Sequence, residues 1–157
     1  SFWQNISKES LNLLEQLSDQ NEFGLIPDFA WIEENGIVPA EGNDVSTKND
    51  GNYSYNALRI PFRLANSDNQ TAQKINEKLL TFFSNQEIVE AGYTLSGKTI
   101  DNYQSISYSS PILMATKDLD EFSGLFSSSR WVMNELIEGK NYYGDSLKVI
   151  AALHLEK

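Results

Sequence analysis

Apolar residues recur every three or four positions in six stretches of this chain, a period typical of helices that bury one face. In the first stretch, Leu11, Leu14 and Leu17 share such a face. The six predicted segments are residues 5–18, residues 55–65, a helix opened by Asn69 or Thr71, residues 112–116, residues 119–126 with 131–137 (one helix interrupted near Gly124, or two), and residues 143–155.

Turn-forming residues separate the predicted helices. Residues 25–33 are predicted to be a short irregular or extended segment, and residues 34–52, rich in Gly, Asn, Asp and Ser, a long loop. Proline suits the first turn of a helix, so the second helix is predicted to start near Ile60 and the fourth at Ser110-Pro111. Residues 86–109 are mixed and turn-rich, with no strong alternation typical of strands, so the predicted fold class is all-α.

The predicted helices carry more apolar surface than one layer can cover. Residues 143–155 have apolar side chains on more than one side, which predicts a deeply buried helix. Six segments would form three helical hairpins, and these need a second layer or a partner to bury their broad apolar faces.

Composition and charge limit the classes of partner. The 157 residues suit one domain, and 40% apolar and 22% charged residues are typical of a globular chain. A net charge of −10 argues against nucleic acid and anionic membranes, and is compatible with a neutral or cationic ligand. There is no apolar run of about 18 residues, so no membrane span is predicted. The absence of cysteine excludes disulfides and thiolate metal sites.

The stretch from Tyr53 to Ala65 carries the candidate chemistry. It mixes aromatic residues, an amide and two arginines with an apolar helical run. A core helix has no need of that mixture, whereas a site for a polar substrate does.

Three patches resemble glycoside hydrolase family 8. Residues 55–63 (Tyr-Asn-Ala-Leu-Arg-Ile-Pro-Phe-Arg) are similar to that family's Tyr-Asp-Ala-x-Arg-x-Pro-x-Arg and are the specific match. Residues 24–28 (Gly-Leu-Ile-Pro-Asp) and 142–147 (Tyr-Tyr-Gly-Asp-Ser-Leu) are weaker matches in the expected order.

The resemblance implies about half of an (α/α)6 barrel, with residues 1–157 as its carboxy-terminal half. It also implies inverting, endo-acting hydrolysis of a β-1,4-linked polysaccharide (glucan, chitosan or exopolysaccharide), without a cofactor and without a metal. The family's general-acid glutamate lies in the other half, so the isolated chain is expected to be inactive. Implied partners are a polysaccharide or oligosaccharide and the missing amino-terminal half or a second chain, in a secreted or cell-surface bacterial protein.

By this resemblance Asn56 stands where the family carries its catalytic aspartate, and an amide cannot take a proton from water. Three explanations stay open. The base has moved to a carboxylate of the long loop, with Glu41 preferred over Asp44 and Asp50; an aspartate has been changed to Asn56; or the chain is an inactive homologue that binds polysaccharide or serves in assembly. Loop acids of this kind are also often simply solvated.

The remaining candidate residues would bind the sugar. Tyr55 and Arg59 resemble cleft residues of the family, although Arg59 could equally form an ordinary salt bridge. Tyr142 and Tyr143 could present rings and hydroxyls to a sugar, or lie in the core with their hydroxyls paired. Trp31, beside the long loop, is the preferred stacking tryptophan.

Other types of site find little support in the sequence. His154 is the only histidine, and a lone histidine makes a poor metal site. Gly92 and Gly97 do not form a phosphate-binding loop.

Overall fold

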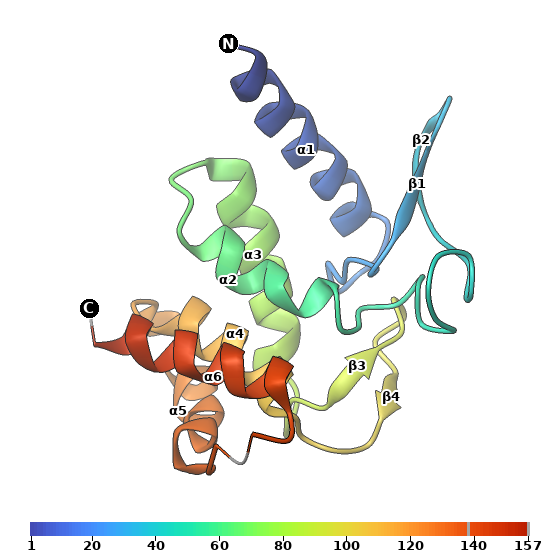
Figure 1. The fold of residues 1–157 in the computed structure, drawn as a ribbon. Coiled ribbons are helices and arrows are strands. Elements are labelled where there is room, and N and C mark those ends of the chain that lie inside the picture. The colour runs from blue at the N-terminus through green and yellow to red at the C-terminus, as the bar shows by residue number, and fades with distance from the viewer. Residues whose placement is uncertain (138, 157) are drawn as a thin grey trace.

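The structure is a computed structural model that describes residues 1–137 and 139–156. Helices dominate it, and two short antiparallel sheets flank them (Figure 1). In chain order the elements are α1 (Phe2–Asp19), β1 (Ala30–Glu33), β2 (Gly36–Pro39), the 3-10 helix η1 (Ala57–Arg59), α2 (Ile60–Ala65), α3 (Gln70–Ser84), β3 (Ala91–Tyr93), β4 (Thr99–Asp101), α4 (Ile106–Thr116), η2 (Asp120–Phe122), α5 (Ser123–Ser129), η3 (Arg130–Asn134) and α6 (Tyr142–Leu155).

Helix α4 lies in the middle of the helical part. Residues 107–116 are all buried, and the helix packs against α2, α5 and α6. Figure 1 shows α6 passing in front of α4 and α5. The predicted start at Ser110-Pro111 is wrong, because the Ser105 hydroxyl caps the helix one turn earlier by accepting from the Ser107 N–H at 3.3 Å, so that Pro111 lies inside the helix.

The prediction of an all-α chain, half of an (α/α)6 barrel built from helical hairpins, is corrected by two β-hairpins. Strand β1 pairs with β2 through a tight turn that ends at Gly36, inside the stretch predicted to be a loop. Strand β3 pairs with β4 within residues 86–109. Asn35-Gly36 between two apolar runs is a hairpin signal. The described chain is thus α-rich with two antiparallel hairpins (Figure 1).

The predicted helix starts near the candidate chemistry are confirmed. Helix α2 begins at Ile60, with Pro61 in its first turn, and η1 precedes it. Asn69 caps α3 as predicted. Residues 119–137, predicted as one helix interrupted near Gly124 or as two, form η2, α5 and η3: 3-10 geometry changes to α at Ser123, beside Gly124, and α5 gives way to 3-10 geometry again at Arg130.

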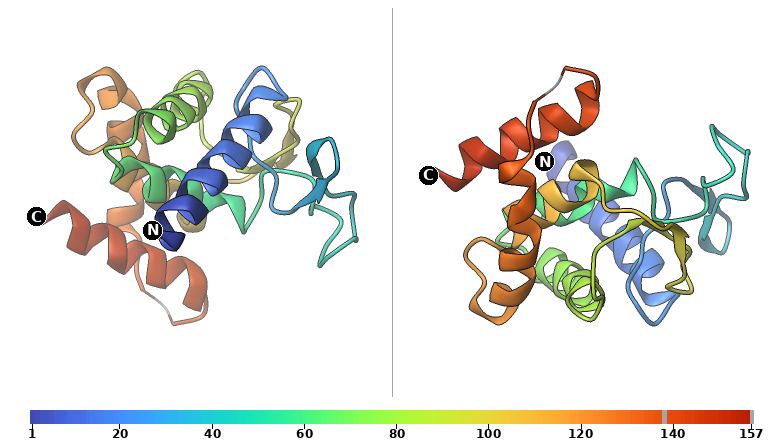
Figure 2. Two further views of the ribbon diagram at one scale, coloured as in Figure 1. Left: turned by 90° about the horizontal axis from the view of Figure 1, so that it is seen from above. Right: turned by 90° about the horizontal axis from the view of Figure 1, so that it is seen from below.

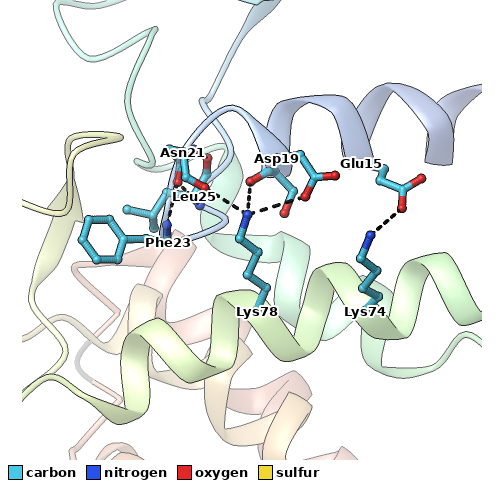
Figure 3. Close-up of polar contacts among 8 residues, drawn as sticks. Glu15, Asp19, Asn21, Phe23, Leu25, Lys74 and Lys78 are labelled. Atoms are coloured by element: carbon cyan, nitrogen blue, oxygen red, sulfur yellow. Dashed lines mark hydrogen bonds and ion pairs between the residues drawn. The ribbon is translucent and has the colours of Figure 1, made fainter.

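A lysine on α3 fixes the end of α1 (Figure 3). The Lys78 ammonium donates to the backbone oxygens of Ser18, at 2.7 Å, and Asn21, at 2.9 Å, and pairs with Asp19 at 3.6 Å. A cation at the carboxyl end of a helix satisfies carbonyls that lack intrahelical partners. The chain then turns at Gly24, whose φ of +70° favours glycine and where a Cβ would meet Lys78 Cγ at 2.8 Å.

Two groups of buried side chains form the core. One joins α3 and α4 to β3 and residues around Tyr53, and the other lies between α1, α2 and α3. The prediction that the last helix is deeply buried is wrong, because Val149, Ile150 and Leu153 of α6 are exposed. The two further views in Figure 2 show α6 along one side of the molecule. None of the helices within residues 1–137 and 139–156 has the length and apolarity to cross a membrane.

The Asn69 cap supplies the first testable prediction. Its Oδ1 accepts from the N–H groups of Thr71, at 2.9 Å, and Ala72, at 3.3 Å. Asn69→Ala removes the acceptor and should lower the free energy of unfolding by about 1 kcal/mol, measured by urea denaturation. Asn69→Asp keeps an acceptor and should stay close to the wild type; equal losses in the two variants would contradict a capping role.

Candidate functional site

The candidate site is built on the turn that leads from a backbone bridge into η1. Tyr53 and Tyr93 exchange two N–H to carbonyl hydrogen bonds of 2.9 Å, which tie the turn to β3. Tyr53 is buried, as are Ala57 and Leu58 of η1. With these side chains turned into the core, Tyr55 and Asn56 are left exposed.

The Asp28 carboxylate holds this turn from a distant part of the sequence. Its Oδ1 accepts from the backbone N–H groups of Ser54, at 3.0 Å, Asn56, at 3.0 Å, and Ala57, at 2.8 Å. These N–H groups open a short helix and have no intrahelical partner, so an anionic acceptor satisfies them as a helix cap would. Burial raises the pKa of Asp28 above its ordinary value of 3.8, and these hydrogen bonds offset the rise only in part.

The Asn56 side chain lies between a carboxylate and a guanidinium group. Its Nδ2 donates toward Asp28 Oδ2 at 3.5 Å, and its Oδ1 accepts from an Arg59 NH2 group at 3.4 Å. Arg59 Nε also donates to the Asn56 backbone oxygen at 3.3 Å. An amide offers the donor and the acceptor that these two neighbours need. An aspartate in the same place would set a second carboxylate beside Asp28, and the two like charges would disfavour ionisation of both.

Aromatic side chains surround Tyr55. Its ring meets that of Tyr108 edge-on with centroids 5.3 Å apart, and its hydroxyl lies 3.1 Å from that of Tyr103. The Tyr143 hydroxyl donates to the Tyr55 backbone oxygen at 2.9 Å, which joins the start of α6 to the turn. Burial, together with the Tyr103 hydroxyl, raises the pKa of Tyr55 to about 12, so this phenol stays neutral and able to donate a hydrogen bond.

These side chains line a cavity of about 360 Å³. Its described lining residues provide aromatic walls, amide and hydroxyl groups, and one formal charge, the Arg59 guanidinium. Apolar walls with a few placed polar groups are typical of small-molecule sites. The lining residues are Tyr55, Asn56, Arg59, Ser107, Asn141 and Tyr143. Within residues 1–137 and 139–156, no cluster of His, Cys, Asp or Glu could hold a metal ion.

The structure brings four of the seven predicted site residues together: Tyr55, Asn56, Arg59 and Tyr143 line this cavity. The other three lie elsewhere. Tyr142 is 85% exposed and is not part of the lining. Trp31 is on the exposed hairpin β1–β2, where its Nε1 donates to Asp44 Oδ2 at 3.1 Å. Glu41 is exposed in the loop after β2.

The three loop acids have different environments. The fully buried Asp50 carboxylate accepts from the N–H groups of residues 45, 46 and 47 at 2.7–2.8 Å. Burial alone would raise its pKa, but the backbone hydrogen bonds outweigh burial and hold the pKa below 3.8. Asp44 accepts from Trp31 and from the Glu41 N–H. The Glu41 carboxylate makes no hydrogen bond or ion pair to another described residue. Asp50 and Asp44 thus organise the loop, and Glu41 is left accessible.

Three residues of the site carried no predicted role. Asp28 falls within one of the patches of resemblance, but its bonds span 26 to 29 positions, which no local pattern reveals. Asn141 caps α6 through the Gly144 N–H, and Ser107 follows the cap of α4. Small polar residues ahead of apolar helices mark helix starts, and that signal could have pointed to both positions.

Comparison with known proteins shows a likeness to glucanases. A β-glucanase from Niallia circulans is 23% identical over 163 aligned residues, which cover 96% of this chain and 39% of that protein. The apo structure of a β-1,3-1,4-glucanase from Paenibacillus sp. X4 matches 98% of this chain and 43% of its own with a TM-score of 0.84 at 22% identity. No protein-family model matches. The chain thus spans about two fifths of the length of these relatives and shares the fold of the matching part of the Paenibacillus structure.

This result corrects the assignment to glycoside hydrolase family 8. No family model supports it, and both relatives are described only as glucanases, at low identity. The inverting reaction and the half-barrel that the resemblance implied are withdrawn with it. What remains is a fold shared with part of a β-1,3-1,4-glucanase and a cavity whose residues the structure defines.

The raised pKa of Asp28 predicts how stability depends on pH. Between 3.8 and its pKa in the folded chain, the folded state holds a proton that the unfolded state has lost. Asp28 therefore makes the chain lose stability as pH rises through this window. Urea unfolding across the acid range should show this loss in the wild type and a flatter profile in Asp28→Asn.

A control variant, Asp68→Asn, makes the same charge change at an exposed position away from the turn. The free energy of unfolding of Asp28→Asn minus that of the wild type should grow as pH rises. The same difference measured for Asp68→Asn should not grow in this way. Parallel profiles for the wild type and Asp28→Asn would contradict the role given to burial of Asp28.

Proposed function

We propose that this chain binds β-glucan in the cavity between the 55–59 turn and the start of α6, as part of a glycoside hydrolase. The observation that carries the proposal is the cavity lining. The rings of Tyr55 and Tyr143 suit the C–H faces of a pyranose, and Arg59 with the amides of Asn56 and Asn141 suits its hydroxyls. The glucanases that the chain resembles support the substrate class.

One observation favours a second candidate, a polysaccharide-binding protein without catalysis. Glycosidases of the common types use a pair of carboxyl groups beside the scissile bond. No carboxylate is among the cavity's lining residues within 1–137 and 139–156, and Asp28 lies behind Asn56 with its Oδ1 bonded to three backbone N–H groups. These lining residues can therefore bind a sugar. Cleavage requires in addition a carboxylate, such as Glu41 or one from another part of the protein.

The adjacent tyrosines of α6 provide a matched test. Titration calorimetry with an oligosaccharide of β-1,3-1,4-glucan should show binding by the wild type. Tyr143→Ala removes a cavity wall and the bond to the Tyr55 backbone, and should weaken the association constant about tenfold, or about 1.4 kcal/mol. Tyr142→Ala should bind as the wild type does, because its side chain lies outside the lining.

Tyr143 also packs against the core, so Tyr143→Ala can fail to fold. Arg59→Ala is therefore the second binding variant, and it should also weaken the association constant, because Arg59 lines the cavity. No binding by the folded wild type, or equal losses in the two tyrosine variants, would contradict the proposal. Release of reducing ends from the polymer separates the two candidates: release supports a hydrolase, and binding without release supports the binding protein.

A further inference from the structure

The hairpin of β3 and β4 holds an aromatic side chain beside the candidate cavity, although it contributes no residue to the described lining. Tyr103 follows β4 and is 49% exposed. Its hydroxyl lies 3.1 Å from that of Tyr55, which does line the cavity. The aromatic surface therefore continues from the cavity wall onto the hairpin.

The backbone of Tyr103 is fixed although its side chain is exposed. Its carbonyl oxygen accepts from the Ala91 N–H at 2.9 Å, and its own N–H donates to the Asp101 oxygen at 3.0 Å. Ala91 is the first residue of β3 and is buried in the core, so Tyr103 is attached to a strand that the core holds in place. A ring that is fixed before a ligand arrives loses less conformational freedom on binding.

Strand β3 also connects this ring to the turn that carries the candidate site. The last residue of the strand, Tyr93, exchanges backbone hydrogen bonds with Tyr53, two positions before Tyr55. Figure 1 shows the hairpin beside the segment that leads into α2. One short strand thus sets the positions of both tyrosines, Tyr55 through its last residue and Tyr103 through its first.

Together the two tyrosines offer a ligand apolar ring surface and a hydroxyl donor. Tyr55 is 42% exposed, so both side chains are accessible from solvent. One hydroxyl donates to the other, which uses one hydrogen of the pair and leaves the second for an acceptor on a ligand. Ring faces with a polar edge suit a pyranose, whose C–H faces can stack and whose hydroxyls can accept.

We propose that Tyr103 forms an outer subsite of the glucan site, where a sugar unit beyond those held in the cavity stacks on its ring. This inference rests on the proposed function, because the cavity has to hold the rest of the same chain. A short oligosaccharide would fill the cavity alone, whereas a longer one would also reach Tyr103. The subsite therefore makes the site prefer long glucan chains to short ones, which the cavity alone does not explain.

Titration calorimetry with a trisaccharide and a hexasaccharide of β-1,3-1,4-glucan tests the subsite. The wild type should bind the hexasaccharide more tightly. Tyr103→Ala should weaken the association constant for the hexasaccharide about fivefold and leave that for the trisaccharide unchanged, because only the longer ligand reaches the ring. Phe2→Ala removes a ring that is 69% exposed at the start of α1, far from the hairpin (Figure 1), and should change neither constant.

Tyr103→Phe separates stacking from a role in orienting Tyr55. It keeps the ring and loses the hydroxyl contact, so it should keep most of the preference for the hexasaccharide. If Tyr103→Phe and Tyr103→Ala weaken both ligands equally, Tyr103 acts only on Tyr55 and the proposal is overturned.

The wild type distinguishes failure of the subsite from failure of the proposed function. Equal affinity for the two ligands would overturn the subsite and leave the glucan-binding cavity standing. No binding of either ligand by the folded wild type would overturn both.

Discussion

The hydrogen bonds between the Asp28 carboxylate and the N–H groups of Ser54, Asn56 and Ala57 hold the candidate site together. They join the segment after α1 to the start of η1, across 26 to 29 residues. A half-buried carboxylate is unfavourable unless donors surround it, and the open end of a short helix supplies such donors. The same bonds fix the backbone that carries Tyr55 and Asn56.

This arrangement gives a physical reason for a neutral residue at position 56. Asn56 can donate toward Asp28 and accept from Arg59 at once, which an aspartate could do only by holding a proton beside the buried carboxylate. The result is a cavity whose described lining residues provide a guanidinium and amides but no carboxylate. Its chemistry suits the recognition of sugar hydroxyls.

The elements with local signals were predictable from the sequence. Asn69 and Pro61 marked helix starts correctly, because capping and proline geometry act within one turn. The hairpin β1–β2 was missed although Asn35-Gly36 is a hairpin signal, because its strands are short and only Ile37 among their residues is buried. The exposed face of α6 was missed because the apolar residues of a helix do not tell which of its sides the fold covers.

The candidate site was predictable in part. The unusual residue mixture of positions 53–65 and the tyrosine pair before the last helix pointed to four residues that line the cavity: Tyr55, Asn56, Arg59 and Tyr143. The role of Asp28 depends on contacts between distant segments, which a single sequence does not contain.

Amide hydrogen exchange at Ser54, Asn56 and Ala57 tests most directly whether Asp28 fixes the site. The N–H groups of these residues precede any intrahelical bond of η1, so Asp28 is their acceptor in the folded chain. The account predicts that all three exchange slowly in the wild type and quickly in Asp28→Ala, while the amides inside α3 stay protected in both. Rapid exchange of the three amides in the wild type, with α3 protected, would contradict it.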